Sequence, residues 1–183
     1  MTKDEIRAWV REQAQRRSPG EVEAASLQAQ RHLLASEAYR SAGRIGCYLS
    51  TPVELQTRMI LERALAEGKT LGAPRFDEGS DSWAHVCMRD PDAVTIGSWK
   101  VPEPLPGEVL EPLDLVIVPG RAFDRSGNRV GHGEGHYDQL LQGFSGISVG
   151  MAFDWQILET VPREAHDRAM DLLFTESGEQ LLP

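Results

Sequence analysis

The stretch from Asp114 to Leu141 most constrains the fold of this chain, because it joins a strand, a glycine-rich loop and a helical segment. Residues 114–119 read DLVIVP, the most apolar strand-forming run of the chain, while residues 137–141 have a helical pattern. Between them lie the alternating glycines Gly131, Gly133 and Gly135. Glycines let the backbone approach a ligand closely, and N–H groups in such a loop and at a helix start attract anions. The stretch therefore predicts an anion-binding loop, although a tight structural turn would have the same spacing.

Apolar segments and helical patterns alternate along the rest of the chain. Strands are predicted at residues 44–49, 69–75, 83–88, 114–119, 146–153 and 171–175, the last of these being the final strand. Helices are predicted at residues 4–16, 19–39 and 51–68, the last two opening at the capping-box patterns SPGE and TPVE. The proline-rich residues 89–112 are predicted to form a long surface connection, and such connections are often functional.

Several of these strands are apolar throughout rather than at every second residue, which indicates a mostly parallel sheet covered on both faces. We therefore expect one α/β domain over residues 1–183, a three-layer α/β/α sandwich. Ligands of such sheets bind at the carboxyl ends of the strands, here after Leu49, Val118 and Phe153.

The composition is that of an ordinary globular protein, and the net charge narrows the choice of partners. The 183 residues are 40% hydrophobic and 26% charged, with a formal net charge of -9. An acidic chain is unfavourable for general nucleic-acid binding and for an anionic membrane surface. No signal peptide or membrane helix is visible, and Cys47 and Cys87 are interpreted as buried thiols. We expect a cytoplasmic monomer that binds small molecules, but no nucleic acid and no membrane.

Charged side chains flank the glycine loop and indicate what it binds. Arg129 comes just before it and can bind a phosphate through a fork of N–H donors. Asp138 comes just after it and would repel a phosphate unless Mg²⁺ bridged them; the alternative is a first-turn carboxylate that favours the helix dipole. His132 and His136 also flank the loop, but without a carboxylate or cysteine in register they are poor zinc ligands.

Four further candidates each have a simpler structural interpretation. Asp167 could complete a metal site or lie in a surface loop before the last strand. Glu54 could bind a polar ligand group at a strand end or act as the capping partner of Thr51. Lys3 and Arg7 share one helix face, which is usually solvated and matters only if the helix folds over an anion.

In their order along the chain, these residues resemble the 5-formyltetrahydrofolate cyclo-ligase (methenyltetrahydrofolate synthetase) family from Lys3 to about Glu176. Residues 114–138, DLVIVPGRAFDRSGNRVGHGEGHYD, look like the family's strand, Phe-Asp, Gly-x-Arg-hydrophobic-Gly, glycine loop and Tyr-Asp. Lys3 and Arg7 match an N-terminal Lys-x-x-x-Arg. The segments YLSTPVELQT, AFDWQ and VPREAHD are similar to further family segments.

The resemblance implies a three-layer α/β/α fold and an ATP- and Mg²⁺-dependent ligase. Its reaction would convert 5-formyltetrahydrofolate to 5,10-methenyltetrahydrofolate, with release of ADP and phosphate. It implies that ATP is bound by Lys3, Arg7, Arg129, Gly131, His132, Gly133, Glu134, Gly135, His136 and Tyr137. The folate would face Leu49, Glu54, His132, Gly133, Glu134, Gly135 and His136. Mg²⁺ would be held by Asp138 and Asp167, and catalytic roles would fall to Arg129 and Tyr137.

Three residues of the loop depart from the family pattern. Glu134 puts a negative charge where a phosphate is expected, a repulsion of about 4 kcal/mol at roughly 4 Å and an effective dielectric of about 20. His136 replaces the first of two tyrosines, and His132 stands where other members carry Tyr or Arg. Two alternatives stay open. One is a folate- or nucleotide-binding protein that keeps the fold but has lost turnover, which Glu134 would explain. The other is a sugar-phosphate isomerase-like enzyme on a similar α/β scaffold, which needs no ATP.

Overall fold

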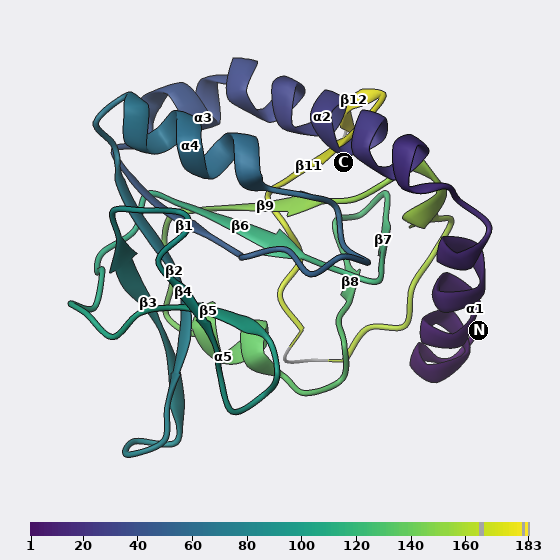
Figure 1. Cartoon of the computed structure of the whole chain (residues 1–183). Helices are drawn as coiled ribbons and strands as arrows, with labels where there is room; N and C mark the ends of the chain where they lie inside the picture. Colours follow the sequence, from purple (N-terminus) through teal and green to yellow (C-terminus); the bar gives the residue numbers. More distant parts are fainter. Residues whose placement is uncertain (165–166, 181, 183) are drawn as a thin grey trace.

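The computed structural model describes residues 1–164, 167–180 and 182, so Ala165 and His166 of the segment VPREAHD lie outside the described residues. Its centre is a seven-stranded sheet in the order β12-β11-β9-β6-β1-β2-β3 (Figure 1). Its strands are β1 (Arg44–Cys47), β2 (Thr70–Asp77), β3 (Ser82–Met88), β6 (Leu115–Pro119), β9 (Ile147–Met151), β11 (Leu172–Thr175) and β12 (Gly178–Gln180). The five inner strands run parallel, whereas β3 and β12 pair antiparallel at the two edges. The predicted mostly parallel sheet is confirmed.

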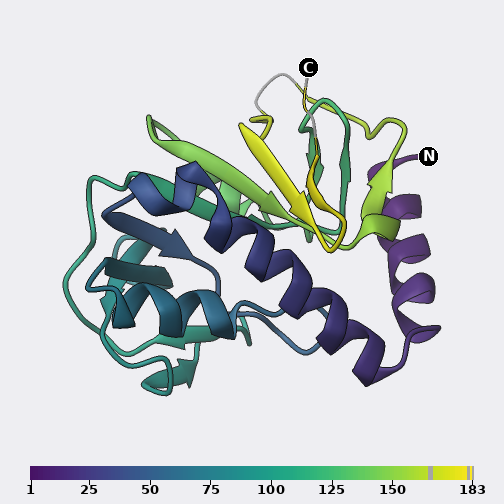
Figure 2. The same cartoon turned by 90° about the horizontal axis from the view of Figure 1, so that it is seen from above.

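Helices and a smaller sheet cover the two faces of the large sheet and complete the three-layer arrangement. The helices α2 (Pro19–Ala35), α3 (Glu37–Ser41) and α4 (Arg58–Ala66) lie on one face, and α5 (His136–Leu140) lies on the other (Figure 1). The smaller sheet consists of β10 (Ile157–Leu158), β7 (Ala122–Asp124) and β8 (Arg129–Val130), and the 3-10 helix η1 (Asp154–Gln156) precedes β10. The first helix, α1 (Lys3–Gln15), lies at the end of the molecule beside this smaller sheet (Figure 2).

The central strand β6 is buried along its whole length, as its apolar run predicts, and its side chains enter two cores. Leu115 and Ile117 belong to the core under α2 and α4, whereas Val116 and Val118 pack with Phe123 of β7. Each such side chain contributes about 1.5–3 kcal/mol through burial. The strand therefore holds both layers together and gives the loops at its carboxyl end a rigid base.

Capping residues decide where α2 begins and ends. The Ser18 hydroxyl accepts from the Glu21 N–H, and the Glu21 carboxylate accepts from the Ser18 N–H at 2.8 Å, so the capping box predicted there is confirmed. The predicted continuation to Tyr39 is wrong, because Ser36 adopts an extended conformation and its hydroxyl accepts from the Tyr39 N–H. One serine thus ends α2 and starts α3.

The helix predicted from Thr51 starts later, at Arg58. The expected contact does form, since the Thr51 N–H and hydroxyl both donate to Glu54 Oε2 at 2.8 Å. The Thr51 carbonyl, however, accepts from the Glu54 N–H at 3.1 Å, as in a turn, and from the Gln56 side chain at 2.9 Å. The Glu54 carbonyl accepts from the Gln56 side chain at 2.8 Å. A side chain that takes over these acceptors keeps the segment in a turn.

Other differences also come from long-range pairing. The connection 89–112 contains an antiparallel pair, β4 (Val94–Ile96) and β5 (Pro102–Pro104). The predicted last strand, β11, is followed by β12, and Pro74 lies inside β2 rather than at its end. Cys47 is buried, whereas Cys87 is only partly buried, and both are free thiols. Among the described residues, no helix has the length and hydropathy needed to cross a membrane.

Candidate active site

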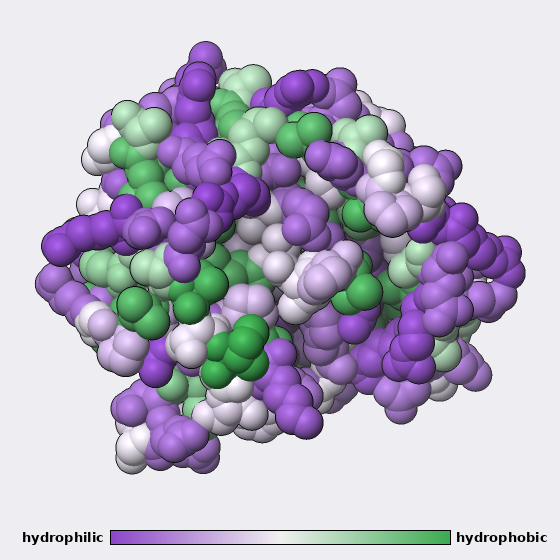
Figure 3. All heavy atoms as spheres, viewed as in Figure 1, coloured by the Kyte–Doolittle hydropathy of each residue, from purple (hydrophilic) through white to green (hydrophobic). Residues whose placement is uncertain are grey.

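A cavity of about 900 Å³ opens beside the carboxyl ends of β1 and β6, where a parallel sheet is expected to bind ligands. It is lined by all the site residues predicted from the sequence: Lys3, Arg7, Leu49, Glu54, Arg129, Gly131, His132, Gly133, Glu134, Gly135, His136, Tyr137, Asp138 and Asp167. The space-filling view shows a hollow in this face, bordered by hydrophilic and hydrophobic residues (Figure 3). The volume is near the upper end of the range for small-molecule sites, which leaves room for two substrates.

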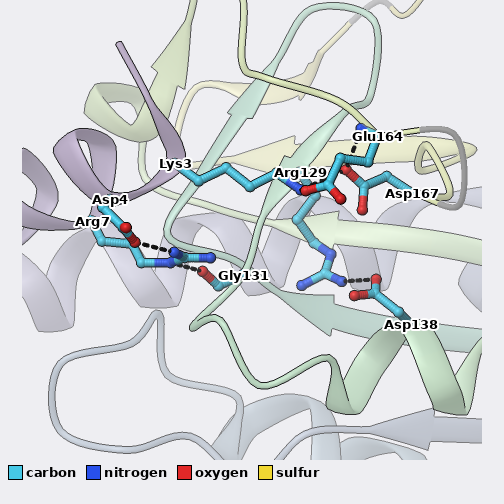
Figure 4. Close-up of polar contacts among 8 residues, drawn as sticks. All are labelled: Lys3, Asp4, Arg7, Arg129, Gly131, Asp138, Glu164 and Asp167. Atoms are coloured by element: carbon cyan, nitrogen blue, oxygen red, sulfur yellow. Dashed lines mark hydrogen bonds and ion pairs between the residues drawn. The ribbon is translucent and has the colours of Figure 1, made fainter.

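The glycine loop, residues 131–135, joins β8 to α5 and is held by α1 (Figure 4). Gly133 and Gly135 have φ angles of 112° and 71°, which strain any residue with a Cβ. Arg7 Nε donates to the Gly131 carbonyl at 2.9 Å, and a Cβ on Gly133 would lie 3.2 Å from Arg7 Cζ. The face of α1 that carries Lys3 and Arg7 is therefore folded over the loop and is not a fully solvated face.

Two cations of the cavity are paired with the two predicted metal-binding carboxylates (Figure 4). Lys3 Nζ donates to Asp167 Oδ2 and to Glu164 Oε1, each at 2.8 Å. Burial alone would lower the pKa of Lys3, but these two carboxylates raise it above its ordinary value. Arg129 Nη2 donates to Asp138 Oδ1 at 2.8 Å. Burial lowers the pKa of Arg129 and Asp138 opposes the shift, so the guanidinium stays charged.

Tyr137 and Arg129 each carry a buried hydrogen-bond donor. Tyr137 Oη and Arg129 Nε are both buried and lack a hydrogen-bond partner within the part of the chain that the structure describes. Burial raises the pKa of Tyr137 well above its ordinary value, so its hydroxyl stays protonated. Buried donors are nearly always satisfied in proteins, so two such donors in cavity-lining residues are unusual and mark Tyr137 and Arg129 as candidates for a role in the site.

The histidines of the loop are neutral at physiological pH. Burial, and next the charge of Arg121, lower the pKa of His132 to about 4, so its 3.5 Å approach to Glu54 is a polar contact and not an ion pair. Burial lowers the pKa of His136, while Glu134, with Oε2 3.4 Å from its Nε2, opposes the shift. The Glu134 side chain is 51% exposed. Water therefore screens its carboxylate, and the repulsion between this carboxylate and a phosphate in the cavity is weaker than for a buried pair of charges.

Several cavity residues were missed by sequence reasoning. His136 packs against Trp83 and Trp99, with ring centroids 4.4 and 4.7 Å apart, and the three rings form an aromatic wall. Trp99 comes from the connection 89–112, whose length was the only signal of function. Arg121, just after β6, was also missed.

By contrast, the segment after Phe153 was expected at the ligand edge but is absent from the lining described. Its Trp155 packs against Trp9, with ring centroids 6.2 Å apart.

The carboxylates described in the cavity fit Mg²⁺ if water and a substrate supply the remaining ligands. Among the residues described, no group of three or more His, Cys, Asp or Glu side chains could hold a metal ion. Asp138 and Asp167 both line the cavity, and two carboxylates with water and substrate phosphates make a common Mg²⁺ shell. Within the part of the chain that the structure describes, the site therefore suits a metal that also takes ligands from water and a bound substrate.

Comparisons with known proteins identify the family. The sequence profile of the 5-formyltetrahydrofolate cyclo-ligase family matches residues 1–176, and the chain belongs to this family. It is 32% identical to the cyclo-ligase of Saccharomyces cerevisiae, over 82% of each chain. It is 29% identical to that of Mus musculus, over 94% of this chain and 93% of the other. The NMR structure of Aquifex aeolicus 5,10-methenyltetrahydrofolate synthetase superposes with a TM-score of 0.87 at 29% identity, covering 100% of this chain and 93% of that one.

Proposed function

We propose that residues 1–183 form one catalytic domain that uses ATP and Mg²⁺ to convert 5-formyltetrahydrofolate to 5,10-methenyltetrahydrofolate, ADP and phosphate. One observation carries the proposal: a single cavity is lined by the residues that the resemblance assigns to ATP and by those that it assigns to folate. The residues assigned to ATP come from α1, β8, the glycine loop and the start of α5. Those assigned to folate include Leu49 and Glu54 after β1. Membership of the family supports the same reaction.

The reaction has to activate a formamide oxygen, which is a poor leaving group. This oxygen attacks the γ-phosphorus of ATP, ADP leaves, and the formyl carbon becomes electrophilic. N10 of the folate then attacks that carbon, the C–O bond breaks, and phosphate leaves with the oxygen while N10 loses its proton. No enzyme nucleophile is required, because alignment of the two substrates and stabilisation of the developing negative charge are sufficient.

The cavity residues supply these two requirements. Lys3 and Arg7, which α1 places at the cavity, bind the phosphates of ATP. Arg129 is oriented by Asp138, and its Nε, which has no partner among the described residues, donates to the charge that develops on the transferred phosphoryl group. The protonated hydroxyl of Tyr137 donates to the reacting groups. Asp138 and Asp167 would hold Mg²⁺, which would neutralise phosphate charge.

A spectroscopic assay tests the proposal. The protein is mixed with 5-formyltetrahydrofolate, Mg²⁺ and ATP, and the absorbance of methenyl-folate is followed, with ATP omitted in the control. We expect a signal only when ATP is present. Folate binding without turnover would instead identify a binding protein of this fold, and turnover of a sugar phosphate without ATP would identify an isomerase.

A further inference from the structure

Arg121 is a cavity cation that the proposed reaction has not yet used. The permanently charged cations that line the cavity, among the residues described, are Lys3, Arg7, Arg121 and Arg129. Three of them hold protein acceptors: Lys3 holds two carboxylates, Arg7 a carboxylate and a carbonyl, and Arg129 a carboxylate. The Arg121 guanidinium makes no hydrogen bond or ion pair within residues 1–164, 167–180 and 182.

The backbone of Arg121 is held on both sides, so its side chain projects from a fixed point. Its N–H donates to the Val130 carbonyl at 2.7 Å, and its carbonyl accepts from Gln156 Nε2 at 2.9 Å. The residue follows β6 and precedes β7, and its side chain is about half-buried at the cavity wall. A charge that is partly removed from water without a partner is unfavourable, and an anion that binds beside it relieves this cost.

The charges around Arg121 lie on both sides of the cavity. Burial lowers the pKa of Arg121, Glu54 opposes this shift, and Arg11 and Arg7 of α1 add to it. Glu54 is already an acceptor for the Thr51 N–H and hydroxyl, so it does not fully neutralise the guanidinium. His132, on the same wall, is neutral because its pKa is about 4. Arg121 therefore supplies positive charge between the α1 side and the Glu54 side.

We propose that Arg121 binds an oxyanion of a substrate where the nucleotide and folate parts of the cavity meet, an inference that rests on the proposed function. A guanidinium suits this role because its planar fork donates two parallel N–H bonds to a phosphate or a carboxylate. Both sources are present in the reaction, since ATP carries phosphates and folate carries glutamate carboxylates. Arg7, which acts electrostatically on Arg121, also holds the glycine loop that is assigned to ATP. Its position therefore favours a phosphate of ATP over a folate carboxylate as the ligand of Arg121.

Direct binding measurements separate the two sources. Arg121→Leu is compared with the wild-type protein by calorimetric titration with a non-hydrolysable ATP analogue plus Mg²⁺, and separately with 5-formyltetrahydrofolate. We expect one of the two affinities to fall roughly 10- to 100-fold, as for a lost hydrogen bond to a charged group. A loss for the ATP analogue identifies a phosphate, and a loss for the folate identifies a carboxylate. Arg121→Lys, which keeps the charge without the fork, should recover part of the affinity.

The control is Arg125→Leu, which removes the same charge from an exposed position four residues away and outside the cavity. It should leave both affinities unchanged. Unaltered affinities for both ligands in Arg121→Leu, or equal losses in the control, would overturn the inference. If Arg121→Leu does not fold, Arg121→Gln is measured against the same outcomes. Binding does not require turnover, so the two proposals can fail separately. If the wild-type protein shows no activity but Arg121→Leu still weakens ligand binding, only the proposed function is refuted.

Discussion

Substitution of Asp138 separates two roles of one carboxylate, as the partner of Arg129 and as a proposed Mg²⁺ ligand. The Arg129 side chain is 9% exposed, and its Nη2 donates to Asp138 Oδ1 at 2.8 Å. Asp138→Ala therefore leaves a buried guanidinium without that acceptor. Breaking a buried pair in this way costs about 3–5 kcal/mol, and we expect about 2–3 kcal/mol because Asp138 is 35% exposed and water reaches that side. Asp138→Asn keeps an oxygen acceptor and should cost about 1 kcal/mol.

Urea unfolding and Mg²⁺-dependent turnover are measured on both variants, with the exposed Asp90→Ala as the control outside the cavity. We expect turnover to vanish in both Asp138 variants, because neither carries a charge for the metal, while only the alanine variant loses much stability. A loss below about 1 kcal/mol for Asp138→Ala would refute the buried-pair reasoning. Normal Mg²⁺-dependent rates for Asp138→Asn would refute the metal assignment.

Three other substitutions test the loop and the core. Glu134→Gln should tighten binding of the ATP analogue by only a few-fold, because the half-exposed carboxylate is screened; unchanged affinity would mean that it faces solvent. Gly133→Ala puts a Cβ on a residue with a φ of 112° and directs it toward Arg7. The free energy of unfolding should fall by about 1–2 kcal/mol, and ATP binding should weaken more than folate binding. Equal weakening of both would contradict this. Burial lowers the pKa of His85 to about 4 from 6.5. The unfolded chain therefore binds the His85 proton more tightly, and the free energy of unfolding is highest above pH 6.5 and falls as the pH drops toward 4. Between pH 7 and pH 5 the wild-type protein should lose about 2 kcal/mol more in urea unfolding than His85→Gln, and equal losses would exclude this explanation.

The local contacts of the site region were predictable, but what they build was not. The Thr51–Glu54 contact forms as predicted, yet Gln56 takes the carbonyls that a helix would need. Asp138 was open to two interpretations, a helix first-turn carboxylate or a metal ligand. The structure adds its pairing with Arg129, which depends on how β8 and α5 are positioned. Spacing along the chain predicts hydrogen bonds within one turn, but it does not predict which more distant group competes for the same atoms.

The sequence by itself determined the parallel α/β sheet, the strand β6 and the glycine loop, because a strand buried on both faces must be apolar throughout and a close backbone turn requires glycine. It also carried the family resemblance, since ordered motifs survive in the chain itself. Only the tertiary structure decided that α1 folds over the loop through Arg7, that Trp83 and Trp99 meet His136, and that Arg121 lacks a partner among the described residues. These features join segments far apart in the sequence, and packing, not local pattern, sets their distances.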